Sequence, residues 1–131
     1  MDIEGMLNKA KELIKNSYAP YSKIRVAAVL VGKSNRLYYG VNVENSSYGL
    51  TMCAERVAIF NAITSGEKEF EVILIYSPDT TPWPCGACRQ VMAEFFTPET
   101  EVIIANTDNV YRLRFKDLWP MEYSFKINKE K

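Results

Sequence analysis

The sequence predicts an α/β protein of three layers, in which helices cover one mixed five-stranded sheet. Apolar residues recur at helical spacing in some segments and form short β-branched runs in others, in the order α-β-β-α-β-α-β-β-α. Strands joined by a short turn pair antiparallel, whereas strands joined through a helix can pair parallel, so this order implies a mixed sheet with helices packed on it. The length of 131 residues is that of one domain, and we expect a single domain over residues 1–131.

The first half of the chain predicts a helix followed by a hairpin. Residues 3–14 place apolar side chains on one side and lysines on the other, which is typical of an amphipathic helix, and Pro20 stops it. Residues 24–31 and 37–43 are β-branched or alternating runs. The polar turn at residues 32–35 between them predicts that the two strands are antiparallel neighbours.

The second half of the chain alternates between helical and strand patterns. Apolar residues repeat at helical period over residues 54–63 until Gly66 supplies a stop. The remaining predicted elements are a buried strand at 72–76, a helix through 91–96 after a proline-rich loop, strands at 102–105 and 110–115, and a short helix at 116–119.

The charge balance and the apolar runs exclude two classes of partner. Sixteen Lys and Arg residues balance sixteen Asp and Glu residues, so we expect no nucleic-acid partner, which would need an excess of positive charge. The longest apolar run, at residues 26–31, is far shorter than the roughly 20 residues of a membrane span, so we expect no membrane association. The acidic N-terminus lacks the basic region of a secretion signal, and we therefore expect a cytoplasmic protein.

Among the residue types, cysteine and histidine limit the possible kinds of functional site most strongly: the chain has three cysteines and no histidine. Cys53 opens the second predicted helix, and Cys85 and Cys88 open the third at a spacing that puts two sulfurs on one face. A helix N-terminus favours thiolate over thiol. Three thiolates without a fourth Cys or His predict a zinc site with an open position, where a water becomes acidic enough to supply hydroxide.

Charged residues beside the cysteines suit a catalytic zinc site. Glu55, two residues after Cys53, is well placed to touch the water that the zinc holds and to carry its proton. Three thiolates and one Zn²⁺ carry a net negative charge, which makes that water less acidic. Arg56 and Arg89 directly follow the cluster, and we expect their guanidinium groups to donate to the sulfurs and to offset this charge.

Four segments of the chain occur in the order and spacing of one known family. They are Tyr-Ala-Pro-Tyr-Ser-Lys at 18–23, Gly-Val-Asn-Val-Glu-Asn at 40–45, Cys-Ala-Glu-Arg at 53–56 and Pro-Cys-Gly-Ala-Cys-Arg-Gln at 84–90. With these motifs the chain resembles the zinc-dependent cytidine deaminases of the short homotetrameric type with three cysteine ligands, from the first helix to about Pro120. The resemblance implies one zinc ion per subunit and the conversion of cytidine and deoxycytidine to uridine or deoxyuridine and ammonia, in pyrimidine salvage.

The resemblance also implies roles for single residues. Glu55 would take a proton from the water and deliver it to ring N3, hydroxide would then attack C4, and Glu55 would protonate the departing ammonia. Asn42 and Glu44 would hold the ribose 3′-hydroxyl, and an amide and a carboxylate two residues apart on a strand do face the same way. Ala54 would contact the substrate. Because a carboxylate at this place repels phosphate, we expect a free nucleoside rather than a nucleotide as the substrate.

Several positions depart from the family pattern or match it less closely. Ile24 stands where an aromatic Phe usually packs against the pyrimidine ring, and Ala27 replaces a usual Gly. We expect Ile24 to keep an apolar contact and to change affinity or substrate preference. We expect Tyr48 at the ribose 5′ side, and Tyr123, or the less well-aligned Phe125, to reach a neighbouring subunit's site in a homotetramer with shared active sites.

Three other interpretations stay open. Cys85 and Cys88 could form a thiol-disulfide redox pair, which would leave Cys53 and Glu55 without a role. The zinc could be structural, with a carboxylate as its fourth ligand. Within the deaminases, Ile24 keeps open a modified cytosine nucleoside or a nucleoside antibiotic as the substrate.

Overall fold

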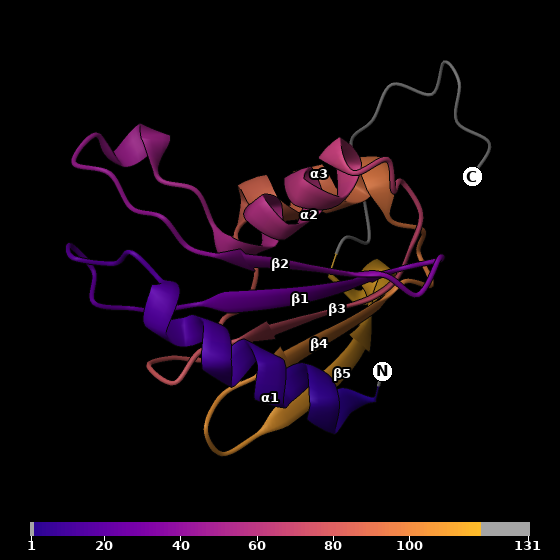
Figure 1. Ribbon diagram of the computed structural model, residues 1–131, viewed down its shortest axis with the longest axis horizontal. Coiled ribbons are helices and arrows are strands. Elements are labelled where there is room, and N and C mark those ends of the chain that lie inside the picture. Colours follow the sequence, from indigo (N-terminus) through magenta and orange to yellow (C-terminus); the bar gives the residue numbers. More distant parts are fainter. Residues whose placement is uncertain (1, 119–131) are drawn as a thin grey trace.

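The computed structural model describes residues 2–118, which form a mixed five-stranded sheet with helices on both faces (Figure 1). The strand order is β2-β1-β3-β4-β5, with β3 and β4 parallel and every other neighbouring pair antiparallel. The elements are α1 (Ile3–Leu13), β1 (Ala27–Gly32), β2 (Leu37–Val41), α2 (Ala54–Thr64), β3 (Phe70–Tyr76), α3 (Gly86–Phe95), β4 (Glu101–Ala105) and β5 (Val110–Arg114).

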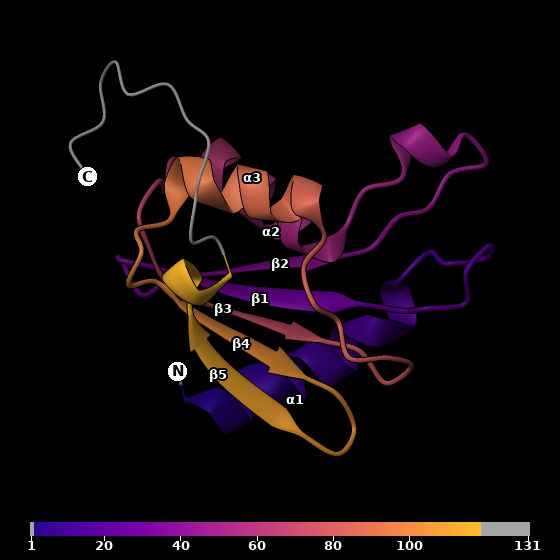
Figure 2. The ribbon, with the colours of Figure 1, turned by 180° about the vertical axis from the view of Figure 1, so that it is seen from behind.

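Helix α1 covers one face of the sheet, and α2 and α3 lie side by side on the other face (Figures 1 and 2). The predicted three-layer arrangement and the mixed five-stranded sheet are therefore confirmed. The prediction of one domain over residues 1–131 stays a prediction, because the structure describes residues 2–118. In that part of the chain, no helix has the length and the apolar character needed to cross a membrane.

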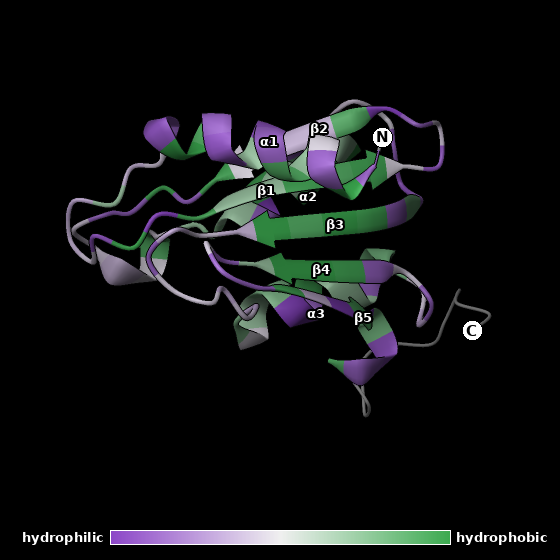
Figure 3. Ribbon diagram, turned by 90° about the horizontal axis from the view of Figure 1, so that it is seen from below, coloured by the Kyte–Doolittle hydropathy of each residue, from purple (hydrophilic) through white to green (hydrophobic). Residues whose placement is uncertain are grey.

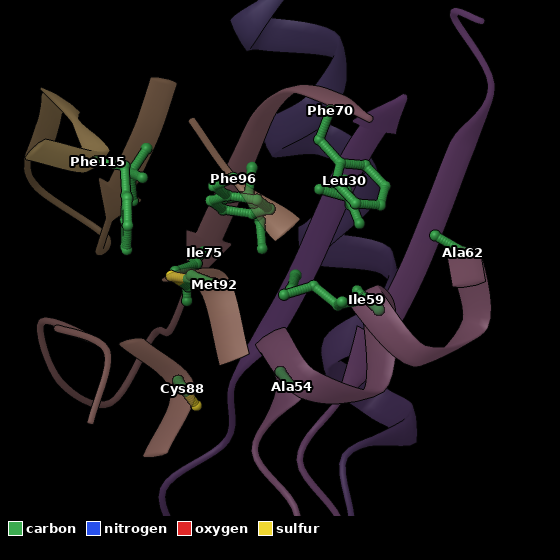
Figure 4. Close-up of a cluster of buried hydrophobic side chains, with 14 of the residues drawn as sticks. Leu30, Ala54, Ile59, Ala62, Phe70, Ile75, Cys88, Met92, Phe96 and Phe115 are labelled. Atoms are coloured by element: carbon green, nitrogen blue, oxygen red, sulfur yellow. The ribbon is translucent and has the colours of Figure 1, made fainter. Parts of the chain in front are cut away.

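The two faces of the sheet carry separate hydrophobic cores. Strands β3 and β4 are hydrophobic along most of their length, as expected for central strands that are buried on both sides (Figure 3). The larger core lies under α2 and α3 and contains aromatic rings packed edge to face, including Phe96 between Phe70 and Phe115 (Figure 4). Cys88 is part of this core, which fixes the position of its side chain.

The predicted first strand begins too early. It was expected from Ile24, but β1 begins at Ala27. The cause is a set of side chains that take the backbone groups before this point: the Asn42 amide donates to the Ile24 carbonyl and accepts from the Val26 N–H, and Asp79 accepts from the Arg25 N–H. These groups are therefore unavailable to a neighbouring strand.

The second strand and the last helix also differ from the expectation. The second strand ends at Val41 rather than at Val43, because Val43 forms isolated bridges to Tyr18 and Met52 instead of continuing the ladder with β1. The expected short helix at 116–119 is a single 3₁₀ turn, Phe115–Asp117, and residue 119 lies outside the described residues.

The close contact between α2 and β2 depends on a glycine. A Cβ atom at Gly40 would lie 2.3 Å from the Ala54 carbonyl oxygen and 2.6 Å from the Ala58 nitrogen, both backbone atoms. The absence of a side chain here lets the first turn of α2 rest directly on the sheet. Because that turn follows Cys53 and contains Glu55, Gly40 sets the height of both side chains above β2.

We expect Gly40→Ala to lower the free energy of unfolding by about 2 kcal/mol, because the added methyl group has to push α2 away from the sheet. Urea unfolding of both proteins at equal zinc concentration measures the difference. Gly49→Ala is the matched control, since nothing lies within 4 Å of a Cβ there. Equal stability of the two variants would show that α2 does not need this approach.

Candidate active site

Three cysteine thiols meet where α2 and α3 begin. The Cys53 and Cys85 sulfurs are 3.8 Å apart, the Cys85 and Cys88 sulfurs are 3.5 Å apart, and all three lie within 4.8 Å of one another. Sulfurs that share one tetrahedral zinc at a bond length of ~2.3 Å lie about 3.8 Å apart. The three thiols therefore fit a single zinc ion, as the sequence predicted.

Local helix geometry places each thiol. Cys53 and Cys85 are the residues immediately before α2 and α3, and both have an extended backbone. The Cys88 N–H, in the first turn of α3, donates to the Cys85 sulfur over 3.4 Å. This bond caps the helix with a sulfur instead of the usual oxygen and keeps Cys85 and Cys88 on the same side of α3.

Glu55 lies at the bottom of the site and is nearly inaccessible to solvent, with 4% of its surface exposed. Burial is the main cause that raises the pKa of its carboxyl to about 7, and the neighbouring Cys53 thiolate adds to the rise. In the absence of a metal ion, Glu55 thus gains and loses a proton near neutral pH, as a carboxyl that carries protons should.

The cysteines differ in their affinity for a proton. The hydrogen bond with the Cys88 thiol and the neighbouring Arg56 lower the pKa of Cys53 to about 5. The contact with Cys53, together with burial, raises the pKa of Cys88. Of these two sulfurs, Cys53 thus carries the negative charge first.

Of the two arginines expected to offset the negative charge, one reaches a thiol. The Arg56 Nη2 atom donates to the Cys53 sulfur over 3.4 Å. Arg89 donates instead to two backbone carbonyls, those of Pro84 at 2.9 Å and Leu118 at 3.2 Å. These bonds hold the residue before Cys85 in place.

A cavity of about 310 Å³ opens above the thiols and brings together most of the predicted substrate-binding residues. Ile24, Asn42, Glu44 and Ala54 line it, together with Glu55. Residues that the sequence analysis did not single out complete the wall: Ser22, Val26, Thr51, Met52, Thr80, Thr81, Pro82 and Trp83.

Most hydrogen bonds of the Asn42 side chain are made with other residues of the protein. Its side-chain oxygen accepts from the Ser17 hydroxyl and from the Val26 N–H, and its amide nitrogen donates to the Ile24 carbonyl over 2.8 Å. A primary amide has two N–H groups, so one of them remains for a ligand. Asn42 therefore shapes the cavity wall that carries Ile24 and lines the cavity at the same time.

Glu44 joins the thiol cavity to a second hollow lined by Tyr21, Ser22 and Tyr48. Its carboxylate accepts from the Tyr21 and Ser22 N–H groups at 3.0 and 3.1 Å and from the Ser22 hydroxyl. The hydrogen bonds from Ser22 hold the pKa of Glu44 below its ordinary value, so the carboxylate stays ionised. Tyr48 is 77% exposed and packs edge to face on Tyr21, outside the thiol cavity. Tyr123 and Phe125 lie outside the described residues.

The thiols, the buried carboxyl and the cavity together define a class of protein. Three protein ligands around one zinc leave a position for water, as in catalytic rather than structural sites. A buried proton-carrying carboxyl next to those ligands, below a cavity, is the arrangement of a zinc-dependent hydrolase.

Comparison with known proteins identifies the family. A family model for the cytidine and deoxycytidylate deaminase zinc-binding region matches residues 1–105. The cytidine deaminase of Sporosarcina psychrophila is 40% identical over 107 residues, 81% of this chain and 79% of the relative. That of Halalkalibacterium halodurans is 38% identical over 122 residues, 92% of each chain. The crystal structure of a cytidine deaminase from Burkholderia pseudomallei superposes with a TM-score of 0.88 and 38% identity, over 94% of this chain and all of that one. The chain belongs to the cytidine and deoxycytidylate deaminase family.

The raised pKa of Glu55 makes the stability of the zinc-free protein depend on pH. An ordinary glutamate has a pKa of 4.5, and Glu55 has a pKa of about 7 in the folded chain, so the folded state binds the extra proton between these values. The contribution of Glu55 to stability is therefore greatest below pH 4.5 and is lost as the pH rises through 7.

Glutamine has no such proton. Between pH 4 and pH 8, we therefore expect the free energy of unfolding of Glu55→Gln to rise by about 3 kcal/mol relative to that of the unsubstituted protein. Urea unfolding after removal of metal by a chelator measures this difference. Glu71→Gln, at an exposed ion pair with Lys33, should show no pH-dependent gain. If the free energies of unfolding of Glu55→Gln and the unsubstituted protein differed by the same amount at every pH, this would contradict the raised pKa of Glu55.

Proposed function

We propose that the protein catalyses the hydrolytic deamination of cytidine and deoxycytidine, in pyrimidine salvage. Water replaces the amino group at C4 of the base, which gives uridine or deoxyuridine and ammonia. One observation carries the proposal: a proton-carrying carboxyl, Glu55, is buried beside three thiols at the bottom of a cavity that polar residues line at its other end. The relatives named above, all cytidine deaminases, support it.

Cys53, Cys85 and Cys88 would hold the zinc ion. When bound, zinc lowers the pKa of a water molecule so that it becomes a nucleophile at neutral pH. Arg56, by donating to the Cys53 sulfur, withdraws negative charge from the ligands and so helps the water to ionise. Arg89 acts at a distance, by fixing the Pro84 carbonyl and with it the position of Cys85.

Glu55 moves the protons of the reaction. Its carboxylate takes a proton from the attacking water and delivers it to N3 of the pyrimidine, which makes C4 more electrophilic. After the water oxygen has bonded to C4, Glu55 takes the remaining proton of the new C4 hydroxyl and gives it to the amino group; the C4–N bond breaks, ammonia leaves, and the C4 carbonyl of uridine forms. A group that must both accept and donate needs a pKa near the working pH, and in the metal-free protein burial raises the pKa of Glu55 to about 7.

The other end of the cavity holds the sugar. Glu44, ionised and fixed by Ser22, accepts a hydrogen bond from the ribose 3′-hydroxyl, and the remaining N–H of Asn42 donates to the same oxygen. Ala54 is the first residue of α2, where backbone N–H groups have no partner inside the helix, so it can donate to a substrate oxygen.

A modified cytosine nucleoside is a second candidate substrate. The observation that favours it is Ile24, an aliphatic side chain that lines the cavity and remains 40% exposed. An aliphatic wall accepts substituents on the base more readily than a stacked ring does. Turnover of a panel of substituted cytosine nucleosides decides between the two.

We also propose a homotetramer with shared active sites, in the cytoplasm. Helix α2 exposes Phe60, 43% of whose surface is accessible, and Tyr48 and Leu50 protrude from the loop that precedes it. Such surfaces call for a partner. The three free thiols suit a reducing compartment.

Glu55→Gln should abolish deamination while leaving the zinc in place. We expect a loss of at least about 100-fold in kcat, measured by the fall in ultraviolet absorbance of cytidine, with the zinc content unchanged by elemental analysis. Glu71→Gln serves as the control and should retain both the deaminase activity and the zinc. Loss of zinc from Glu55→Gln would identify the carboxylate as a ligand of a structural site. Turnover without any bound metal would overturn the zinc mechanism.

A free nucleoside should be preferred over a nucleotide, because the ionised Glu44 carboxylate repels a phosphate. We expect kcat/KM for cytidine to exceed that for CMP by more than about tenfold at low ionic strength. Glu44→Gln should bring the kcat/KM values for cytidine and CMP closer together. Equal efficiency with both substrates would count against a sugar-binding role for Glu44.

Sedimentation equilibrium tests the assembly. The expected mass is about four times the chain mass of 15.0 kDa. Replacing Phe60 by Lys on the outer side of α2 should shift the distribution towards smaller species, because it places a charge in an apolar contact. A fully active monomer would contradict the shared-site proposal.

A further inference from the structure

Trp83 is the only aromatic residue among the described residues that line the thiol cavity. It lies two residues before Cys85, in the loop between β3 and α3, and 47% of its surface is exposed. We infer that Trp83 is the wall against which the pyrimidine base packs, and that it determines the affinity of the enzyme for the base. This inference rests on the proposed function.

Contacts with β5 and with the residue that follows β4 hold the loop of Trp83. The centroid of the Trp83 ring is 5.5 Å from that of Tyr111 on β5, with the two planes at 40°. The backbone N–H of Trp83 donates to the Thr81 carbonyl at 2.9 Å, and the Thr81 hydroxyl accepts from the Asn106 side-chain amide at 2.8 Å. These contacts tie the loop to the end of the sheet, so the ring needs little ordering when a ligand binds.

Ile24 is a second apolar residue of this cavity, and an ion pair connects its segment to the loop that carries Trp83. The Asp79 carboxylate accepts from the backbone N–H, Nε and Nη2 of Arg25, each at 2.9 Å. Arg25 is adjacent to Ile24, and Asp79 begins the stretch that leads to Trp83. The two segments, which adjoin the same end of the neighbouring strands β1 and β3, are therefore joined directly by this ion pair.

The position of Trp83 along the cavity assigns it to the base rather than to the sugar. C4 of the base has to lie next to the thiols and Glu55, because the reaction takes place there. Trp83 is close in sequence to Cys85 at this end, whereas Glu44 adjoins the hollow of Tyr21 and Tyr48 at the other. A flat base beside an indole ring gains contact area and a favourable arrangement of π-electrons.

Steady-state kinetics of two substitutions provide the test. We expect Trp83→Leu to raise KM for cytidine about tenfold and to change kcat by less than about threefold, because the side chain contacts the base but no reacting atom. Trp83→Phe should restore KM to within about threefold. KM for deoxycytidine should rise by the same factor, because Trp83 does not touch the sugar. Glu71→Gln, at an exposed residue that lines neither the thiol cavity nor the hollow of Tyr21 and Tyr48, is the control and should leave KM unchanged.

Fluorescence gives a readout that does not depend on turnover. The chain has two tryptophans, so in a Trp119→Phe variant all tryptophan emission comes from Trp83. Uridine, the product, should change this emission in a saturable way, and should do so in the zinc-loaded enzyme without being consumed. Trp83→Phe covers the case in which Trp83→Leu fails to fold.

The outcomes separate this inference from the proposed function. An unchanged KM in Trp83→Leu, or emission that does not respond to saturating uridine while cytidine is deaminated, overturns the role of Trp83 alone. Failure of the unsubstituted zinc-loaded protein to deaminate cytidine overturns the proposed function and the inference with it.

Discussion

The site depends on two helices that begin at the same end of one sheet face. Three thiols from two elements, thirty-two residues apart at Cys53 and Cys85, come within ligand distance only because α2 and α3 pack side by side on the larger core. Gly40 lets the first turn of α2 lie directly on β2, and the buried Cys88 fixes α3 from below. The catalytic geometry is thus a consequence of core packing, since no loop has to hold a ligand by itself.

The second constraint is electrostatic. Three thiols and a carboxyl group lie close together in a buried region. Groups that would carry like charges cannot all ionise in a medium of low dielectric constant. The structure distributes the charge: Arg56 and the contact with Cys88 favour ionisation of Cys53, while burial favours the protonated form of Glu55. The helix N-termini add partial positive charge on the same side. Glu55 thereby becomes the group that exchanges a proton near neutral pH, which is the property that the proposed deamination requires.

Much of this site could be predicted from the sequence because its residues are linked to local signals. Helix periodicity predicts the cysteines at helix starts. The two-residue spacing of Asn42 and Glu44 predicts side chains that face the same way, and both line the cavity although β2 ends before them. The errors arose where tertiary contacts decide. The strand does not reach Ile24, since the Asn42 side chain takes the backbone groups that a ladder would use. Arg89 contacts carbonyls rather than sulfur, because α3 directs it to Pro84 and Leu118. Trp83 lies in a proline-rich loop without periodicity, and only its closeness to Cys85 in sequence could have pointed to it.

X-ray absorption at the zinc edge tests the central claim most directly, on protein purified without chelators. Three sulfur neighbours at ~2.3 Å and one oxygen neighbour at ~2.0 Å, with one zinc per chain, are the result that the structure predicts. Because the chain has three cysteines and no histidine, a fourth protein ligand would appear as a further oxygen that exchange into other buffers does not alter. A zinc ion with fewer than three sulfurs, or protein without zinc, would contradict the account.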